Sequence, residues 1–356
     1  MMRKRLLRTG LLLAIVGLAV VSGEAIRVAP VIFDIQVPGG SEHTVSFTVR
    51  NDEAEPVSIE IRLCDWRRDV QGNNRFCQDA GDVARSATPW LSATPQQFDL
   101  EPEASRDVRL NMRVPETLAN GEPLDGTYWS AAMIAATPQA SDDDGGGTKI
   151  VVKRRFGLKV LVSITGTGTR QGQVSNLRPH GLNPLWLTLE FQNRGTLNLN
   201  DVSGRVEIRD DQGETIERID VESFPILPGA TRQLQVQSEK PLGARLPPGR
   251  YVALAILDYG GDNPVGAQAV FEVPELNLQP LGDADSVPQD LNDDGLYEDV
   301  NGNGELTLDD PALLGFAVDE PSVQDNWPAF DFTNDGRATF DDVLALKQRV
   351  NEGDDS

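Results

Sequence analysis

Positive charge is scarce in this 356-residue sequence, in which 32 Lys and Arg stand against 55 Asp and Glu and give a formal net charge of −23. A general nucleic-acid binder is therefore not expected, because phosphate contacts need clustered Lys and Arg. Histidine is scarcer still: His43 and His180 are the two present, which excludes a histidine-rich metal site. We expect both at the surface, with His43 in a polar turn. No nucleophile, HExxH or phosphate-loop motif occurs, so the sequence predicts that the protein is not an enzyme.

Cysteine is equally rare: the sequence contains two, Cys64 and Cys77. Their spacing fits neither a zinc site nor a redox motif. In an oxidising compartment the pair is predicted to form a disulfide that closes a short loop and stabilises the fold by about 3 kcal/mol. Two free thiols are the alternative if the protein is not exported.

The apolar run at residues 11–21 is too short to span a bilayer. It follows the basic residues Arg3, Lys4, Arg5 and Arg8 and precedes small residues at the positions that a signal peptidase recognises. This order predicts a signal peptide over residues 1–25, with a membrane anchor as the alternative. We therefore expect a secreted, periplasmic or cell-surface protein that has no membrane span after cleavage.

Glycine and proline are abundant, at 33 and 23 residues, which favours short strands over long helices. From residue 26 to about 273, polar and apolar residues alternate over short runs such as 44–49 and 185–191. Period-two alternation interrupted by Gly, Pro and Asn indicates antiparallel strands with one buried face.

A weak internal repeat organises this β region. FDLEPEASRDVRL begins at Phe98 and FPILPGATRQLQV begins at Phe224, and each copy continues to a Gly-x-Tyr segment, at 126–128 and 249–251. A Tyr in such a position can bond back to the backbone at the corner of a sandwich. Two copies of one plan predict two sandwich domains in tandem.

The stretches IRVAPVIFDIQVPGGSEHTVSFTVRNDEAEPVSIEI and LSATPQQFDLEPEASRDVRL resemble the first domain of periplasmic pilus chaperones. The paired-domain layout is also similar to that of Gram-positive cell-wall proteins that partner WxL-type surface proteins. Pilus chaperones hold the terminal carboxylate of their subunit with an Arg on the first strand and a Lys on the last. The resemblance therefore implies Arg27, which stands out of register by one residue, and either Lys153 or Lys159.

The strand predicted over residues 149–164 has two interpretations. It is either an edge that accepts a partner strand or an ordinary last strand leading into the second domain. The acidic, glycine-rich segment before it, at about 138–148, is expected to be a mobile hairpin tip.

The negative charge is concentrated at the C-terminus, where residues 281–356 hold twenty Asp or Glu and three Lys or Arg. Two segments there, DVNGNGELTLDD and DFTNDGRATFDD, have oxygen-bearing side chains at alternate positions and Gly at position 6, the pattern of a calcium loop. A helical segment follows each of them, and in the second one Val343, Leu344 and Leu346 are predicted to begin an apolar stripe. The predicted calcium ligands, with position 7 acting through its backbone carbonyl, are Asp299, Asn301, Asn303, Glu305, Thr307 and Asp310 in one loop and Asp331, Thr333, Asp335, Arg337, Thr339 and Asp342 in the other. An acidic solvated tail is the alternative.

A third candidate precedes them, at Asp290, Asn292, Asp294 and Glu298. Its first half fits a calcium loop, but it overlaps the next loop and ends at Asn301 without a final carboxylate. The sequence leaves open whether this segment is a weaker calcium site or an extension of its neighbour.

The duplicated loop–helix unit resembles a dockerin module, whose two loops use Asp at position 12. This resemblance implies a protein partner, either cohesin-like or another surface protein. Thr333 at position 3 is expected to weaken the second site. Positions 10 and 11 hold Leu308-Asp309 and Phe340-Asp341 in place of the hydroxyl pair common in cellulosomal dockerins, so the partner stays open.

The sequence thus predicts a mostly β protein: two tandem immunoglobulin-like β-sandwiches followed by a small α-helical, EF-hand-like calcium module. Its predicted function is that of a secreted non-catalytic adaptor or cell-surface assembly protein that docks to a partner through the dockerin-like module. One alternative is a periplasmic pilus or fimbrial-type assembly chaperone. Another is a carbohydrate-binding accessory of a polysaccharide-degrading complex, for which exposed aromatic residues would be needed; the candidates are Trp66, Trp90, Trp129 and Trp186, the last two expected in a core or interface.

The predicted organisation assigns every part of the chain to a segment. The segments are a signal peptide over 1–25, a chaperone-like immunoglobulin-like domain over 26–166, a second immunoglobulin-like domain over 167–274, a linker over 275–289, the calcium module over 290–350 and an acidic tail over 351–356.

Overall fold

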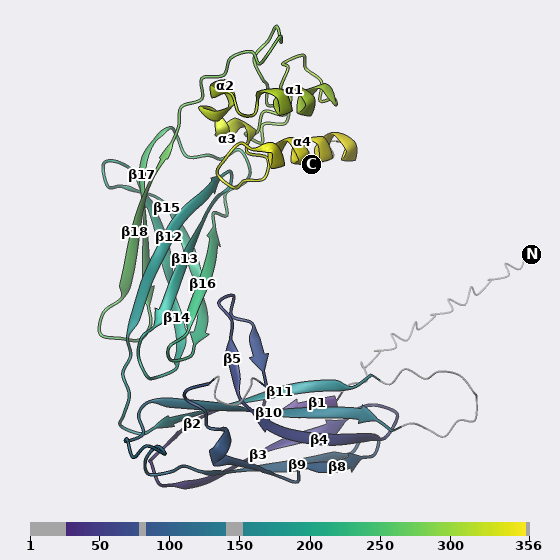
Figure 1. Ribbon diagram of the computed structural model, residues 1–356, viewed down its shortest axis with the longest axis vertical. Helices are drawn as coiled ribbons and strands as arrows, with labels where there is room; N and C mark the ends of the chain where they lie inside the picture. Colours follow the sequence, from purple (N-terminus) through teal and green to yellow (C-terminus); the bar gives the residue numbers. More distant parts are fainter. Residues whose placement is uncertain (1–25, 78–82, 140–151, 354–356) are drawn as a thin grey trace, which may run out of the picture.

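The computed structural model describes residues 26–77, 83–139 and 152–353. The predicted signal peptide, nearly all of the predicted hairpin tip and the last three residues of the acidic tail lie outside this part. Figure 1 shows three bodies in a bent array: one sandwich lies across the bottom, a second stands upright from one end of it, and a small helical body caps the far end of the second. Within the described residues, no helix is both long and apolar enough to cross a membrane.

The first sandwich has two sheets that enclose a core of aliphatic side chains. One sheet has the strand order β1 (Ile26–Ala29), β3 (Glu42–Asn51), β9 (Ser105–Arg113) and β7 (Leu91–Thr94), the last preceded by a short helical turn η1 (Thr88–Trp90). The other has the order β2 (Ile32–Val37), β11 (Arg154–Ile164), β10 (Thr127–Pro138), β4 (Val57–Cys64) and β8 (Gln97–Leu100). The predicted alternation is visible in β4, where Val57, Ile59 and Ile61 face the core.

The chain changes sheets within its first strands. β1 pairs antiparallel with β3, whereas β2 pairs parallel with β11. β2 is therefore the edge strand of its sheet and covers only part of β11. One expectation is wrong nearby: His43 lies within β3, opposite Met112 of β9, and not in a turn, because the strand begins two residues before the alternating run at 44–49.

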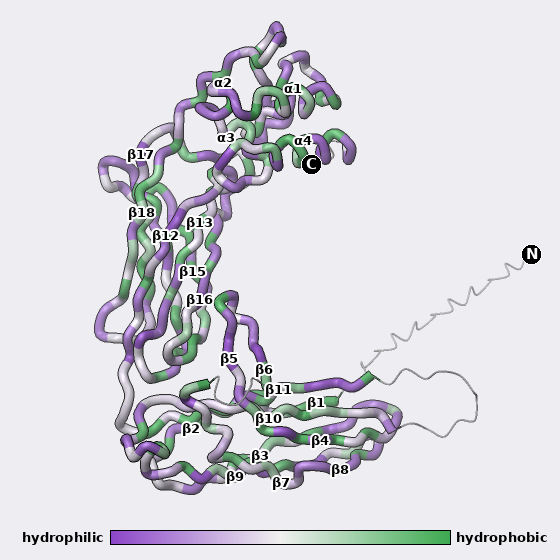
Figure 2. Tube along the Cα trace, viewed as in Figure 1, coloured by the Kyte–Doolittle hydropathy of each residue, from purple (hydrophilic) through white to green (hydrophobic). Residues whose placement is uncertain are grey.

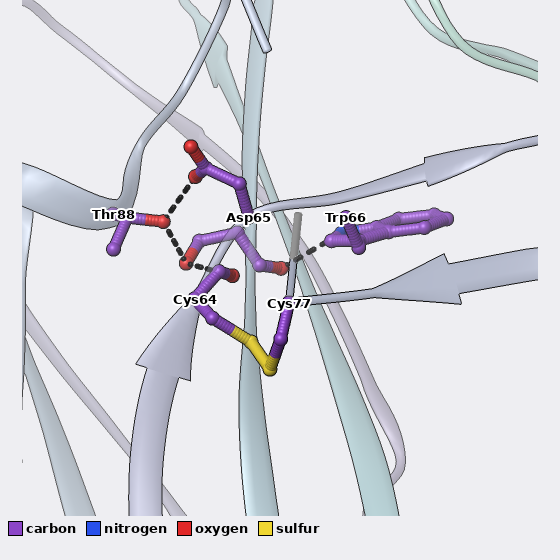
Figure 3. Close-up of a disulfide and its surroundings, with 6 residues drawn as sticks. Cys64, Asp65, Trp66, Cys77 and Thr88 are labelled. Carbon is purple, nitrogen blue, oxygen red and sulfur yellow. Dashed lines mark hydrogen bonds between the residues drawn. A yellow bond between two sulfur atoms is a disulfide. The ribbon is translucent and has the colours of Figure 1, made fainter. Parts of the chain in front are cut away.

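A β-hairpin, β5 (Trp66–Arg68) and β6 (Asn74–Phe76), rises from the first sandwich into the angle between the two sandwiches (Figure 1). The predicted disulfide is confirmed: Cys64, at the end of β4, is bonded to Cys77, directly after β6 (Figure 3). Beside it, the buried carboxylate of Asp65 accepts hydrogen bonds from the hydroxyls of Ser86 and Thr88. The bridge and these bonds fix the base of the hairpin on the sheet.

The second sandwich has a three-stranded and a four-stranded sheet. The first has the order β12 (Gly172–Leu182), β13 (Leu185–Asn193) and β16 (Thr231–Gln237). The second has the order β15 (Thr215–Ile226), β14 (Leu199–Arg209), β17 (Gly249–Asp258) and β18 (Val265–Val273). In both sandwiches hydrophobic and hydrophilic residues are interspersed along the strands (Figure 2), which is typical of sheets with one solvated face. The mostly β fold class is confirmed.

A buried apolar cluster joins the two sandwiches. It consists of Trp66, Val83, Trp129, Ala131, Leu161 and Leu227. The hairpin adds two hydrogen bonds across the same boundary: the N–H of Gln233 donates to the carbonyl of Val70 at 2.7 Å, and Arg68 donates to the carbonyl of Pro225 at 2.5 Å. The angle between the sandwiches is thus braced by packing and by directional bonds.

The internal repeat corresponds to equivalent structural positions. Tyr251 donates its hydroxyl proton to the carbonyl of Pro247 at 2.8 Å, which is the corner bond that the sequence predicts. In the first copy, the hydroxyl of Tyr128 accepts from the N–H of Asp125 at 3.5 Å. The predicted bond from the Tyr hydroxyl to a backbone carbonyl is therefore made in the second copy, whereas in the first copy the hydroxyl accepts a longer bond.

A second pair of equivalent residues, Asn51 and Asn193, was not apparent from the sequence. Both are fully buried, and each closes the loop after its strand with three bonds to the backbone. Asn51 bonds to Glu53, Glu55 and Leu100, and Asn193 bonds to Gly195, Leu197 and Ile226.

The C-terminal body contains the helices α1 (Asp309–Ala317), α2 (Pro321–Gln324), α3 (Trp327–Phe330) and α4 (Phe340–Glu352). α1 and α4 are the helices that the sequence places after the two calcium-type loops. Leu314 and Leu346 are fully buried in a separate small core. The predicted apolar stripe of α4 includes Val343 and Leu346 but not Leu344, which is 51% exposed because it lies on the opposite side of the helix from this core.

Candidate functional site

The two full calcium-type loops fold alike. In each, the oxygens of the Asp at position 1 accept the backbone N–H groups of positions 5 and 6, and those of the Asp at position 12 accept the N–H groups of positions 3 and 9. In the first loop, Asp299 bonds to Asn303 and Gly304 and Asp310 to Asn301 and Thr307, at 2.7–3.2 Å. In the second, Asp331 bonds to Asp335 and Gly336 and Asp342 to Thr333 and Thr339, at 2.7–2.9 Å. Each loop therefore wraps its backbone around two carboxylates.

Glycine at position 6 is required by the turn. Gly295, Gly304 and Gly336 have φ angles of +80°, +89° and +88°. Side chains are strained in this left-handed region, whereas glycine adopts it readily. The same turn therefore occurs in all three candidate segments, including the incomplete first one.

Carboxylates are unusually well buried in the two full loops. Asp299, Asp310 and Asp342 are 0% exposed and Asp331 is 3% exposed. Burial raises the pKa of Asp331 to about 6; its bonds from the backbone oppose this shift, and the charges of Asp342 and Asp335 add to it. Within the described residues, none of these four forms an ion pair with Lys or Arg. A bound cation would offset both the burial and the mutual repulsion.

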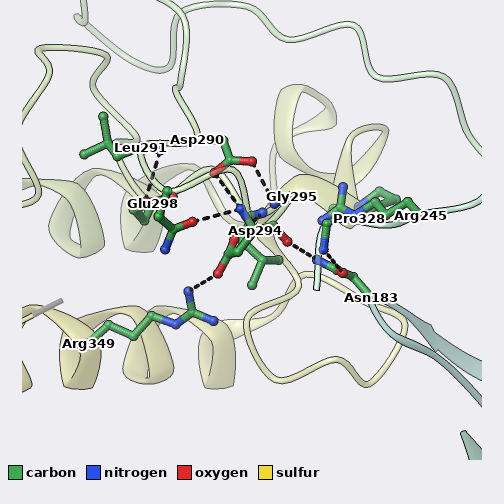
Figure 4. A network of polar contacts seen from close by, with 12 residues as sticks. Asn183, Arg245, Asp290, Leu291, Asp294, Gly295, Glu298, Pro328 and Arg349 are labelled. Atoms are coloured by element: carbon green, nitrogen blue, oxygen red, sulfur yellow. Dashed lines mark hydrogen bonds and ion pairs between the residues drawn. The ribbon is translucent and has the colours of Figure 1, made fainter. Parts of the chain in front are cut away.

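The incomplete first segment brings its acids closest together. Ligand oxygens of Asp290, Asp294 and Glu298 all lie within 4.8 Å of one another (Figure 4). The oxygens of Asp290 accept the N–H groups of Asp294 and Gly295, as the Asp at position 1 does in the full loops. Burial raises the pKa of Glu298 to about 7, and the nearby charges of Asp294 and Asp290 contribute to the shift.

The loops also attach the helical body to the second sandwich. The indole N–H of Trp186 donates to the carbonyl of Asn334 at 2.6 Å, and the Asn334 side chain bonds to the backbone of Asn183 and Pro184. The side chain of Asn183 donates in turn to the carbonyl of Asp294 at 2.7 Å. Two of the three candidate loops are therefore bonded directly to the turn between β12 and β13.

The helices of this body expose four large apolar side chains. Leu308, Phe316, Phe340 and Leu344 are 56%, 87%, 59% and 51% exposed. All four belong to α1 and α4 or to the residue directly before α1, and these two helices pack against each other. Exposed apolar side chains on two neighbouring helices are candidates for contact with a partner protein.

Along about half of its length, one side of β11 pairs with none of the described strands. β10 pairs with it from Arg154 to Ser163, but β2 pairs with it only from Lys159 onward. The N–H of Lys159 donates to the carbonyl of Val31 and so points to the β2 side. Because backbone groups alternate along a strand, those of Arg155 and Gly157 point the same way, where none of the described strands pairs with them. The beginning of β11 is thus an open sheet edge.

Uncompensated positive charge lies where this open edge ends. The ammonium of Lys159 and the guanidinium of Arg68 each lie 5.7 Å from the ring centroid of Trp66. The pKa of Lys159 is lowered mainly by burial and to a lesser extent by the charge of Arg68. The pKa of Arg68 is lowered in the same way, by burial and then by the charge of Arg232. Within the described chain, none of the three cations forms an ion pair with a carboxylate.

The chaperone-type pair of cations implied by the sequence is not assembled. Arg27 lies on β1, forms an ion pair with Asp52 and has a side chain that is 73% exposed. Lys153 pairs with Glu60 at 3.3 Å. Since β1 and β11 belong to opposite sheets, Arg27 cannot join Lys159, and Arg68 from the hairpin lies there instead.

The tryptophan candidates for sugar binding are mostly inaccessible. Trp66 and Trp129 are 1% and 6% exposed, in the cluster that joins the sandwiches. Trp90 is half-buried, and Trp186 stacks on His180 with ring centroids 4.2 Å apart. Trp129 and Trp186 thus lie in an interface, as expected. His180 is half-buried by this stacking, and burial lowers its pKa.

Sequence reasoning missed the residues that connect the bodies. Position 4 of a calcium loop carries no ligand, so nothing in the pattern distinguished Asn334. Arg68 and Arg232 are far apart in the sequence. They come close together only because the β5–β6 hairpin extends into the angle between the two sandwiches. Within the sandwiches, the sequence does carry a signal for Asn51 and Asn193. Each Asn ends a predicted strand at an equivalent place in the two copies of the repeat.

Comparison with known proteins finds similarity in structure alone. No protein-family model matches the chain, and no curated protein is similar to it in sequence. Among solved structures, it is similar to a chaperone–tip adhesin complex of CFA/I fimbriae, at 11% identity and a TM-score of 0.37, covering 69% of this chain and 98% of the other. It is also similar to the YadV chaperone, at 14% identity and a TM-score of 0.33 over 69% and 99% of the chains.

A third similar structure is the CsuC–CsuE chaperone–tip adhesion subunit complex of Acinetobacter baumannii, at 12% identity and a TM-score of 0.35, covering 59% and 89%. At these scores the similarity adds no argument to the sheet topology described above.

Proposed function

We propose that this chain is an exported, non-catalytic assembly protein that binds an extended segment of a partner protein along the open half of β11, in the manner of a pilus-type chaperone. The observation that carries the proposal is the edge itself: β11 continues for residues 154–158 beyond the start of its neighbour β2. Unpaired N–H and C=O groups on a sheet edge accept an added strand.

The surroundings of the edge support this proposal. Val31, Ile32 and Val152 are 56%, 45% and 60% exposed; Ile32 begins β2, Val31 precedes it, and Val152 lies just before β11. They offer apolar contacts to alternate side chains of an added strand. Lys159, with Arg68 close by, marks the end of the open half, where an unpaired cation would attract the carboxylate at the end of a partner chain.

The test is a proline substitution that removes one free donor. In Arg155→Pro the lost N–H is not used by the β10 pairing, so the sandwich is expected to keep its stability. Arg155→Ala is the matched control, since it loses the same side chain but keeps the N–H. Binding of peptides that represent terminal strands of the source cell's surface proteins is measured by fluorescence anisotropy. The proposal expects binding to wild type and Arg155→Ala and at least tenfold weaker binding to Arg155→Pro. Equal binding by both variants, or none by any, would overturn it.

A second candidate function concerns the helical body. We propose that its two full loops bind calcium and that the apolar face of Leu308, Phe316, Phe340 and Leu344 docks a further protein partner. What supports calcium is the pair of buried, unpaired carboxylates in each loop, because hard oxygen ligands suit this ion. A partner that depends on this face would be lost with Phe316→Ser and retained with Ala312→Ser, an exposed site on the same helix.

A further inference from the structure

Three acids gather outside the two full loops, at the junction of the helical body with the second sandwich. Asp290, Asp294 and Glu298 place ligand oxygens within 4.8 Å of one another. Acidic clusters are common on protein surfaces and by themselves say little. This cluster differs because one of its members is almost entirely withdrawn from water.

Glu298 is 1% exposed, and its two carboxylate oxygens differ in their hydrogen bonding. Oε1 accepts the N–H of Leu291 at 3.1 Å, whereas Oε2 is buried and has no hydrogen-bond partner among the described residues. A buried carboxylate oxygen without a partner is costly, and the Glu298 carboxylate also lies close to two further acids. A bound cation supplies the missing partner and reduces the repulsion at the same time.

The charged neighbours do not fill this role. Arg349 pairs with Oδ2 of Asp294 at 3.0 Å, on one side of the cluster (Figure 4). Arg245 is directed to the carbonyl of Pro328, and its Nε has no partner. Neither arginine reaches Oε2 of Glu298. Within the described residues, the Glu298 carboxylate therefore has no ion pair with Lys or Arg.

The ligand set has the chemistry of a calcium site. All its donors are oxygens, from three carboxylates and the amide of Asn292, whose Oδ1 also accepts the N–H of Asp294 at 2.9 Å. Cysteine and histidine, the ligands that select zinc, are absent from the cluster. Glu298 stands at position 9 of this segment, and its carboxylate accepts the backbone N–H of Leu291 at position 2. In the full loops, an Asp at position 12 accepts the N–H groups near the start of the loop instead.

We propose that Asp290, Asn292, Asp294 and Glu298 bind a third calcium ion, which fastens the helical body to the second sandwich. The segment is already bonded to that sandwich, because Asn183 donates to the carbonyl of Asp294. A methyl group placed on Gly295 would meet Asn183 and Gly243 at 3.1 Å, so the two bodies are in close contact here. An ion in this loop stiffens the side of the helical body that the sandwich touches. The proposal does not require the two full loops to be occupied.

The test compares two identical substitutions in the full mature chain. Glu298→Gln removes the buried charge from the cluster, and Glu305→Gln changes an exposed side chain whose calcium contact would come from its backbone. Calcium added to metal-free protein is counted by titration calorimetry. The proposal expects one ion fewer for Glu298→Gln than for wild type and no change for Glu305→Gln. The same number of ions for Glu298→Gln as for wild type would overturn it.

A double variant separates this proposal from calcium binding by the full loops. Asp310→Asn with Asp342→Asn is expected to lose the ions of the full loops and to keep the one that Glu298→Gln loses. Hydrogen exchange gives a second readout: calcium should slow exchange at residues 183–186 in wild type and in Glu305→Gln but not in Glu298→Gln. Calcium-independent exchange there in wild type would refute the fastening role. Absence of calcium binding in wild type would refute both proposals.

Discussion

The indole N–H of Trp186, on a strand of the second sandwich, donates a 2.6 Å hydrogen bond to the backbone carbonyl of Asn334, inside the second calcium-type loop. This one bond connects a β-sandwich to a loop whose shape depends on two buried carboxylates. It indicates that the helical body is held on the sandwich and is not a freely tethered appendage. The bond leads to the first prediction.

Trp186→Phe is expected to loosen the second loop while leaving the sandwich folded. Phenylalanine keeps an aromatic ring against His180 but has no N–H for the carbonyl of Asn334. Loss of one such bond is worth about 1 kcal/mol, which corresponds to a roughly fivefold faster hydrogen exchange at residues 331–342. Trp90→Phe, in the first sandwich, is the control. Unchanged exchange in Trp186→Phe would contradict the coupling.

Removal of the disulfide is expected to destabilise the first sandwich. Cys64→Ser with Cys77→Ser should lower its free energy of unfolding by about 3 kcal/mol, because the unfolded chain regains the freedom of the closed loop. Urea unfolding followed by tryptophan fluorescence measures the change, since Trp66 belongs to the hairpin and the indole N–H of Trp129 donates to its carbonyl. Reduction of the wild type should reproduce the effect, and reduction of the double variant should do nothing more.

The second sandwich is expected to lose stability in acid through Glu207. Hydrogen bonds from Arg209 and Arg205, and then their charges, lower the pKa of this buried carboxylate from 4.5 to about 2. Because the folded-state pKa lies below the unfolded one, the stabilisation is complete above pH 4.5 and disappears as the pH falls towards about 2.

Glu207→Gln tests this assignment by thermal unfolding across that pH window. The variant should be less stable than wild type at pH 7, and the difference should shrink between pH 4.5 and about 2. Glu222→Gln, on the exposed surface of β15, is the matched control and should follow the wild type. A difference that is constant with pH would exclude Glu207 as the titrating group.

Calcium is expected to stabilise the helical body of the full chain. An ion that binds only the folded loops at a hundred times its dissociation constant contributes about 2.7 kcal/mol. Circular dichroism of EDTA-treated protein should show a calcium-dependent gain in helix or in the unfolding temperature of this body. Asp342→Asn should reduce the gain, whereas Asp341→Asn, at the exposed neighbour, should not. An identical response of both variants would argue against the second loop as a site.

Short-range patterns explain why so much of the fold could be predicted. Alternation along Val57, Ile59 and Ile61 sets which face of a strand is buried, and Gly at position 6 sets a turn, whatever the remainder of the chain does. The disulfide followed from the count of cysteines. The two repeated copies predicted two sandwiches, and Tyr251 makes the corner bond expected from its Gly-x-Tyr segment.

The site could be predicted only where it is local in sequence. The loop residues from Asp290 to Asp342 lie within short segments whose spacing indicates their chemistry. The family resemblance pointed to Arg27, out of register by one residue, but the sequence of one strand does not reveal that it joins the sheet opposite β11. Leu344 was misplaced for a similar reason, since the pattern of a helix does not fix which neighbour it faces.

By itself, then, the sequence determined the strands, the turns, the disulfide partners and the three acidic loops, since each is set by spacing within a few residues. Three features were decided only by the tertiary structure. β2 pairs with only half of β11, and Arg68 lies close enough to Lys159 to lower its pKa. Oε2 of Glu298 is buried without a hydrogen-bond partner among the described residues. These features depend on contacts between segments far apart in the chain. Sequence spacing carries no information about such contacts, because they arise only when separate sheets, a hairpin and a helical body pack together.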